Sequence, residues 1–516
     1  MPMTFRSRLL AATLCASALA APAGAETLAD AIALAYQNNP TLQAQRASQR
    51  ALDENYVQAR SGWRPTLGLQ VTASWAETQT PIAGRGVDLD GDGVPDSFGS
   101  GGVRRSNRGQ AGVSFNQPLW TGGRVAASVN AANADVLAGR ESLRRTESVV
   151  LAQVIQAYAD TRRDQESLRI RQENVNVLTR QLQESQARFE VGEITRTDVA
   201  QSQARLAQAQ SLYQSAVAQL AITRAGYATL VGQNPGDLAP EPSLAYMLPT
   251  DPDEAYKIAE EFSPQLRAQQ FAEQASRARI AGARAERMPN VSANFTVGHA
   301  GLIDPFDPRD NFGRSVSATI TATVPIYSGG LVSSRVRQSV ERNNADRITV
   351  EGVRRTVLQG VTQFWSQLIA ARANIASSEL QVSAARIAAE GTRQEQQVGL
   401  RTTLDVLNAE QELRQAQLNQ VSSRRDEYVA AANMLATMGR LEARNLVPSV
   451  PQYDAAKNFR KLRMTWGWVP WEEPVDIIDQ YLTAWPSSKP VSKSSEPTAT
   501  PGLQPAPTVT LAPATR

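Results

Sequence analysis

The chain is 516 residues long, and its 53 Lys and Arg residues nearly balance its 50 Asp and Glu residues, which leaves a formal net charge of +3. This balance gives no support to binding of nucleic acid or another polyanion. A single cysteine, Cys15, and a single histidine, His299, exclude a disulfide-stapled scaffold and a Cys/His metal cluster.

Residues 1–25 have the composition of a secretory signal peptide. Arg6 and Arg8 precede an apolar run, and Ala23-Gly24-Ala25 supplies a small-residue cleavage pattern. Cleavage after Ala25 would also remove Cys15. No later segment offers about 18 consecutive apolar residues. We therefore predict a bacterial periplasmic, outer-membrane or secreted location.

The rest of the chain is an internal duplication. QPLWTGGRV at 117–125 recurs as VPIYSGGLV at 324–332, and VGEITRTDV at 191–199 recurs as VGLRTTLDV at 398–406. The first copy is longer between its two predicted strands. We predict a first copy at 26–232 and a second copy at 263–440.

Each copy is predicted to run helix, strand, loop, strand, very long helix, tight turn and helix. No proline occurs from Leu119 to Asn234 or from Ile326 to Val447, which fits long helices because proline interrupts a helix interior. A helix of just under 70 residues would be about 100 Å long. The expected bounds are a hairpin at 67–118, a long helix at 123–190 and a helix at 197–231, then a hairpin at 290–326, a long helix at 331–397 and a helix at 402–438.

The return helix of the first copy carries a heptad seam, which indicates coiled-coil packing. Its members alternate steps of three and four residues: Leu206, Ala209, Tyr213, Ala216, Leu220, Thr223, Tyr227 and Leu230.

Four segments alternate apolar and polar residues with the period of a strand. In the first of them the apolar positions are Leu67, Leu69, Val71, Ala73 and Trp75. A soluble sandwich gives the same alternation, but two hairpins between long helices in an exported chain favour strands that span a membrane. Four strands cannot close a barrel, and an open edge in lipid leaves backbone groups unpaired at several kcal/mol each. Several chains must therefore pool their hairpins, as eight strands from two chains or twelve from three.

The duplicated helix–hairpin–helix plan, QPLWTGG with VPIYSGG, and the two VGxxxxxDV turns resemble the TolC family of outer-membrane export ducts over roughly residues 26–447. The resemblance implies a mixed fold of α-helices and a transmembrane β-barrel. Each chain of a homotrimer would give four strands to a twelve-stranded barrel in outer-membrane lipid, above a long α-helical coiled-coil tunnel in the periplasm.

The same resemblance implies a channel of a tripartite type I secretion or efflux system, with either protein or small molecules as cargo. Its partners would be a periplasmic membrane-fusion adaptor and an inner-membrane transporter, with no nucleic acid. No catalysis and no required cofactor are expected. The alternative is a periplasmic coiled-coil adaptor whose strands form a soluble β-domain.

An equatorial belt around the tunnel is also implied. It would draw on residues 233–262 between the copies and on 441–486, where Trp468 and Trp471 belong to an aromatic-rich segment. Residues 487–516 are rich in Pro, Ser and Thr and are predicted to be disordered.

The two VGxxxxxDV turns are the candidate functional site. Gly192 and Gly399 suit turns with unusual backbone angles, and Thr195 and Thr402 are candidate N-caps of the returning helices. On a purely structural interpretation, an aspartate three residues after each cap complements the helix N-terminus.

The resemblance adds a gate to these turns. It implies that Arg401 bonds Thr197 and Asp198, and that copies of Asp405 form an acidic ring at the constriction, which would favour cations. The chain departs from the family pattern at two places: Asn408 stands where a second acidic ring is expected, and Gln396 replaces an aromatic gate partner.

The segment DLDGDGVPD has the spacing of a calcium loop, with Asp88, Asp90 and Asp92 at positions 1, 3 and 5 and Asp96 at position 9. Position 12 is Gly99 rather than glutamate, so it is not a complete EF-hand. It lies between the first two predicted strands, in a loop that faces outside in outer-membrane barrels. Weak Ca²⁺ binding and a merely solvated acidic turn both remain open.

Overall fold

The computed structural model describes residues 25–80, 102–302, 312–462 and 468–482. The calcium-loop candidates Asp88, Asp90, Asp92 and Asp96, the expected tail at 487–516 and nearly all of the expected signal peptide lie outside these ranges. The chain forms two compact units. The helical unit comprises the described parts of residues 1–60, 128–280 and 333–466, and the sheet unit comprises those of 61–127, 281–332 and 467–516.

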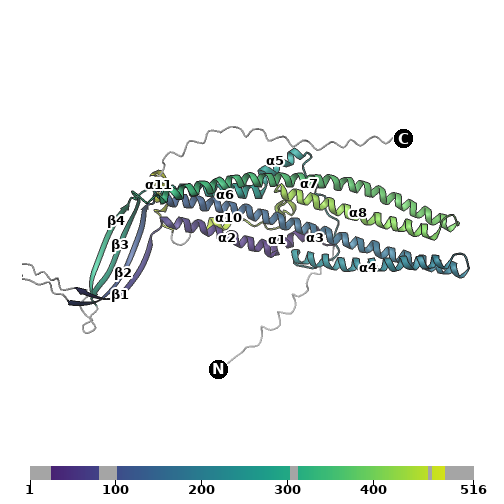
Figure 1. Ribbon diagram of the computed structural model, residues 1–516, viewed down its shortest axis with the longest axis horizontal. Helices are drawn as coiled ribbons and strands as arrows, with labels where there is room; N and C mark the ends of the chain where they lie inside the picture. Colours follow the sequence, from purple (N-terminus) through teal and green to yellow (C-terminus); the bar gives the residue numbers. More distant parts are fainter. Residues whose placement is uncertain (1–24, 81–101, 303–311, 463–467, 483–516) are drawn as a thin grey trace, which may run out of the picture. The chain divides into compact units, whose positions relative to one another are not determined.

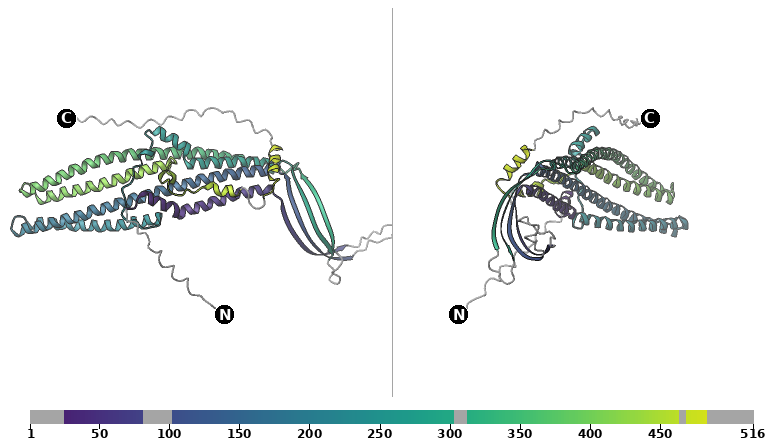
Figure 2. Two further views of the ribbon diagram at one scale, coloured as in Figure 1. Left: turned by 180° about the vertical axis from the view of Figure 1, so that it is seen from behind. Right: turned by 60° about the vertical axis from the view of Figure 1, so that its left-hand side comes forward.

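Two long antiparallel helix pairs dominate the helical unit. Helices α3 (Arg124–Glu190) and α7 (Leu331–Gln397) contain 67 residues each and turn back into α4 (Arg196–Val231) and α8 (Thr403–Thr437). Both views show α3 beside α4 and α7 beside α8 (Figures 1 and 2). The remaining helices are α1 (Leu28–Asn38), α2 (Pro40–Arg60), α5 (Pro252–Phe262), α6 (Pro264–Ala285), α9 (Ala443–Leu446) and α10 (Ala455–Leu462).

The core of the helical unit lies where both copies meet the segment that connects them. Tyr158 of α3 is fully buried, and its hydroxyl oxygen lies 2.7 Å from the carbonyl oxygen of Ala239 and 2.9 Å from that of Glu26. Burial raises the pKa of Tyr158 to about 12, so this hydroxyl keeps its proton at neutral pH. Tyr227 of α4 donates to the Glu26 carboxylate at 2.6 Å. These bonds attach Glu26 and the 233–262 segment to the long helices.

The sheet unit contains four antiparallel strands in chain order, β1 (Thr66–Thr80), β2 (Gly102–Trp120), β3 (Asn290–Leu302) and β4 (Phe312–Thr323). The register aligns apolar residues across the sheet, because Leu69 pairs with Val113, Val113 with Val297 and Val297 with Val316. Most of this apolar face is exposed. Among the described residues, β1 and β4 each have a neighbouring strand on one side only. The predicted combination of long helices and two hairpins is confirmed.

The residues after the second copy divide between the two units. In the helical unit, α10 packs along α2, with the ring of Phe459 centred 4.8 Å from that of Tyr56. In the sheet unit, α11 (Glu472–Leu482) contacts β2 and the short 3-10 helix η1 (Ser61–Trp63). The expected belt segment is 441–486. In the structure its helices pack separately, α10 against α2 and α11 against β2 and η1.

The carboxylate of Asp479 holds α11 to the sheet unit. It accepts hydrogen bonds from the backbone amides of Thr121 and Gly123, both at 3.0 Å, and from the Thr121 hydroxyl at 2.9 Å. The indole Nε1 of buried Trp63 donates a fourth, longer bond of 3.4 Å. A second carboxylate, that of Glu472, accepts from Arg64 Nε at 3.0 Å. Asp479 thus satisfies two amides at the point where β2 passes into α3.

We expect Asp479→Ala to destabilise the attachment of α11 by about 2–4 kcal/mol, because buried donors lose their acceptor. Amide hydrogens of α11 should then exchange more than about tenfold faster in a hydrogen–deuterium exchange measurement. Glu473→Ala changes an exposed neighbour on the same helix and should leave exchange near the wild-type rate. Equal exchange in the two variants would contradict the assigned role of Asp479.

Candidate gate at the two helix turns

Each long helix ends in a left-handed glycine. Gly192 has φ +79° and Gly399 has φ +81°. The amide of Gly192 donates to the Phe189 carbonyl and that of Glu193 to the Arg188 carbonyl, both at 2.9 Å. Gly399 and Leu400 repeat this pattern at 3.0 and 2.9 Å. These paired bonds form a Schellman motif, which satisfies carbonyls at the end of a helix and requires positive φ at the glycine.

A capping box starts each returning helix. Thr195 precedes α4, where its amide and hydroxyl donate to the Asp198 carboxylate at 3.0 and 2.8 Å, and its hydroxyl accepts from the Asp198 amide. Thr402 and Asp405 make the same three bonds at the start of α8. Both aspartates therefore complete helix N-termini, as the structural interpretation of the turn sequence predicts.

The capping bonds change the acidity of Asp405. The amide and hydroxyl of Thr402 lower its pKa, and the nearby charge of Arg401 lowers it further. Its contribution to helix stability is present above the usual Asp pKa of about 3.9. The contribution is lost as the pH falls through the lowered pKa of the folded state. At neutral pH Asp405 is therefore ionised.

A salt bridge crosses each turn, with opposite polarity in the two copies. In the first turn Arg188 of α3 donates to the Glu193 carboxylate at 2.8 and 3.1 Å. In the second turn Glu395 of α7 accepts from Arg401 Nε at 2.8 Å. The pair raises the pKa of Arg401, and Arg188 lowers that of Glu193. Glu395 stands at the position of Arg188 in the repeat, so the long helix contributes a base in one copy and an acid in the other.

Within one chain, the structure does not bring Arg401 to Thr197 and Asp198. Arg401 bonds Glu395, and Asp198 bonds Thr195. The second carboxylate oxygen of Asp198 and the two terminal nitrogens of Arg401 make no hydrogen bond among the described residues. Both groups therefore keep atoms free for a further partner.

Asn408 and Gln396, the two residues that depart from the family pattern, each contact a polar side chain. Asn408 accepts from Arg205 Nη2 at 3.1 Å, and Gln411 accepts from Arg205 Nη1 at 2.7 Å, so Arg205 of α4 bridges to α8. Gln396 is buried, and its amide lies 3.5 Å from the Thr403 hydroxyl. No local spacing in the sequence indicates the role of Arg205, because its partners are about two hundred residues away.

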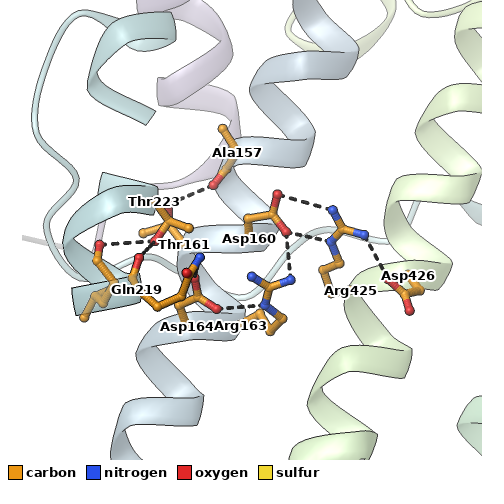
Figure 3. A network of polar contacts seen from close by, with 10 residues as sticks. Ala157, Asp160, Thr161, Arg163, Asp164, Gln219, Thr223, Arg425 and Asp426 are labelled. Atoms are coloured by element: carbon orange, nitrogen blue, oxygen red, sulfur yellow. Dashed lines mark hydrogen bonds and ion pairs between the residues drawn. The ribbon is translucent and has the colours of Figure 1, made fainter. Parts of the chain in front are cut away.

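A polar network joins the two helix pairs farther from the turns (Figure 3). Arg425 of α8 donates from Nε and Nη2 to the two carboxylate oxygens of Asp160 in α3, at 2.7 and 3.2 Å. Arg163 lies 3.3 Å from the same carboxylate and 2.8 Å from that of Asp164. A bidentate pair of this kind fixes orientation as well as distance. Asp160 and Arg425 thus hold α3 and α8 together within the helical unit.

Two further properties of the described residues bear on function. No helix among them has both the length and the apolar character needed to cross a membrane. Within the same ranges, no group of three or more His, Cys, Asp or Glu side chains is arranged to hold a metal ion.

Gly399→Ala should destabilise the second turn by about 1–2 kcal/mol, because a Cβ disfavours the left-handed conformation. A Cβ at this position meets no atom within 4 Å, so crowding does not contribute. Gly391→Ala makes the same chemical change inside α7, also in open space, and should stabilise the helix by about 0.5–1 kcal/mol. Local opening free energies from hydrogen exchange test this difference in sign. A loss of stability in both variants would contradict it.

Known proteins match this chain over most of its length, including both turns. A family model described as outer membrane efflux protein matches residues 31–233 and 255–440. The chain is 33% identical to the outer membrane efflux protein BepC of Brucella suis, over 86% of this chain and 91% of that protein. It is 27% identical to the alkaline protease secretion protein AprF of Pseudomonas aeruginosa, over 78% of this chain and 82% of that protein.

The crystal structure of the Campylobacter jejuni CmeC outer membrane channel has the same fold, with a TM-score of 0.68 at 14% identity over 84% of this chain and 89% of that channel. The family match confirms the predicted export function and decides against a periplasmic adaptor. The chain belongs to the outer membrane efflux protein family, and its function is that of an outer-membrane export channel.

Proposed function

We propose that three copies of this chain form one channel, with their twelve strands closed into a barrel in outer-membrane lipid. The observation that carries this proposal is the four-stranded sheet, whose apolar face is exposed and whose outer strands β1 and β4 have one neighbour each among the described residues. A spanning sheet must close because lipid offers no partner to edge backbone groups. Pairing β1 of one copy with β4 of the next closes the barrel.

The long helices would then form the wall of a periplasmic tunnel. Twelve helical segments, two pairs from each copy, would surround its lumen. The turns at Gly192 and Gly399 would form the end at which a periplasmic adaptor and an inner-membrane transporter engage the channel. Exposed apolar side chains at these turns, Val191, Val398 and Leu400, support this assignment, because solvent-exposed apolar clusters mark contact surfaces.

The gate of the tunnel would lie at the same turns. Arg401 of one copy would bond Thr197 and Asp198 of a neighbouring copy through the atoms that its own chain leaves free. Three copies of Asp405, ionised at neutral pH, would place an acidic ring at the constriction and favour cations.

Cargo of two classes is compatible with this channel. BepC is described as an efflux protein and AprF as a protein for alkaline protease secretion. We propose that the energy comes from the transporter, with the present chain as a passive conduit for either class.

The sequence between β1 and β2 supports a further proposal, that this segment binds Ca²⁺ weakly. Asp88, Asp90, Asp92 and Asp96 provide carboxylate oxygens at the spacing of a calcium loop. Affinity in the millimolar range of extracellular modules is expected, because the loop lacks the glutamate at position 12.

Purified trimers should form channels in planar bilayers, and Arg401→Ala or Asp198→Ala should raise their single-channel conductance by removing the latch. Glu395→Ala is the matched control, because it removes the partner of Arg401 in its own chain and leaves Thr197 and Asp198 intact. Its conductance should stay at or below the wild-type value. Unchanged conductance in both latch variants, with intact trimers, would contradict the latch. Absence of any channel activity in the wild type would contradict the proposed barrel of three copies.

Millimolar Ca²⁺ should raise the melting temperature of the trimer, because a ligand that binds the folded state stabilises it. Asp90→Asn should abolish this increase, since it replaces a charged ligand at position 3 of the loop. Magnesium at equal ionic strength controls for screening. An equal rise in the wild type and the Asp90→Asn variant would show that the loop is a solvated acidic turn.

A further inference from the structure

Helix α11 has its polar and apolar faces inverted. Glu472 and Asp479 are 0% exposed against the protein, whereas Ile477 is 58% exposed and Ile478 and Trp471 are exposed as well. At about 100° per residue, the two buried carboxylates share one side of the helix, and Pro474, Ile477 and Ile478 lie on the opposite side. A helix at a protein–water boundary has the reverse arrangement.

The two buried carboxylates of α11 are compensated by hydrogen bonds. Asp479 accepts four hydrogen bonds from Trp63, Thr121 and Gly123, and Glu472 pairs with Arg64. Buried carboxylates with this many partners are fixed in place, because each would lose its compensation if the helix rotated. The isoleucines are therefore held outward by the bonds on the other side.

The register of the sheet shows which face α11 touches. Trp471 Nε1 donates to Gln117 Oε1 at 3.2 Å. Gln117 follows Phe115 by two residues in β2, so both side chains point to the same face. Phe115 pairs with Leu67 and with Phe295. Helix α11 therefore meets the sheet at the end of its exposed apolar face.

We propose that the outward face of α11 is inserted into the lipid at the periplasmic boundary of the outer membrane. Ile477 and Ile478 would enter the acyl region, and Trp471 with the preceding Trp468 would lie at the headgroup level, where indole rings are favoured. The inference rests on the proposed barrel, because its apolar sheet face must face lipid for α11 to continue that surface. The occupant is lipid rather than a second copy, because Trp471, next to α11, bonds the strand whose exposed apolar face the proposed barrel would turn to lipid.

The test measures the environment of a nitroxide label at Ile477→Cys in the full-length protein, in a Cys15→Ala background, reconstituted into phosphatidylethanolamine–phosphatidylglycerol vesicles. Leu69→Cys reports on the apolar sheet face, and Ile387→Cys reports on an exposed isoleucine of α7 in the helical unit. Collision rates with oxygen, which partitions into lipid, and with a water-soluble nickel chelate are compared. We expect the oxygen-to-nickel ratio at Ile477→Cys to exceed that at Ile387→Cys by about threefold or more, and to approach that at Leu69→Cys.

The outcomes separate this inference from the proposed channel. A lipid-like ratio at Leu69→Cys with a water-like ratio at Ile477→Cys would overturn the insertion of α11 and leave the barrel standing. Protection of the label at Ile477→Cys from both reagents would also overturn it, because another protein surface would then cover the helix. Water-like ratios at both positions would overturn the insertion together with the proposed barrel.

Discussion

Backbone groups at the edges of a sheet need hydrogen-bond partners, and the arrangement of the strands in this protein depends on that requirement. In lipid each unpaired amide or carbonyl costs several kcal/mol, and β1 and β4 each have one neighbour among the described residues. A single chain therefore cannot place its sheet in a membrane alone. The duplication supplies two hairpins per chain, and in the proposed channel the pairing of three copies would supply the closure. Each hairpin is followed directly by a long helix, α3 from Arg124 or α7 from Leu331.

The turns satisfy their own backbone groups, which limits the strength that the proposed gate could have. The Schellman bonds use the backbone amides of the turns. The capping boxes use one carboxylate oxygen of Asp198 and one of Asp405, all within the same chain. Arg401 already has Glu395 as a partner. A latch to another copy would exchange or extend an exposed salt bridge, and exposed pairs contribute only about 0–1 kcal/mol. A latch of this size would suit the proposed gate, because a bond worth about 0–1 kcal/mol is readily broken.

The sequence predicts the parts of this protein that depend on local chemistry. The glycine turns and capping threonines lie where the repeated VGxxxxxDV motif indicates, because Gly192 and Thr195 act on backbone within a few residues. Partners that are distant in sequence could not be predicted. From the sequence, Asn408 is only the loss of an expected acidic residue. In the structure it accepts a hydrogen bond from Arg205 of the other helix pair. Asp479 bonds Thr121, 358 residues away, and its burial reverses the usual rule that acids are exposed.

The two strand-to-helix junctions, although repeated in sequence, differ in their support. In the first copy Thr121 and Gly123 are buried beneath α11 and bonded to Asp479. In the second copy the corresponding segment is open, with Ile326 96% exposed and Tyr327 89% exposed. The bonds of Asp479 hold Thr121 and Gly123 just before α3, whereas α7 begins after Gly329 and Gly330, where an added Cβ would meet no atom within 4 Å. Among the described residues, the first junction is therefore buried and bonded to Asp479, whereas the second junction is exposed.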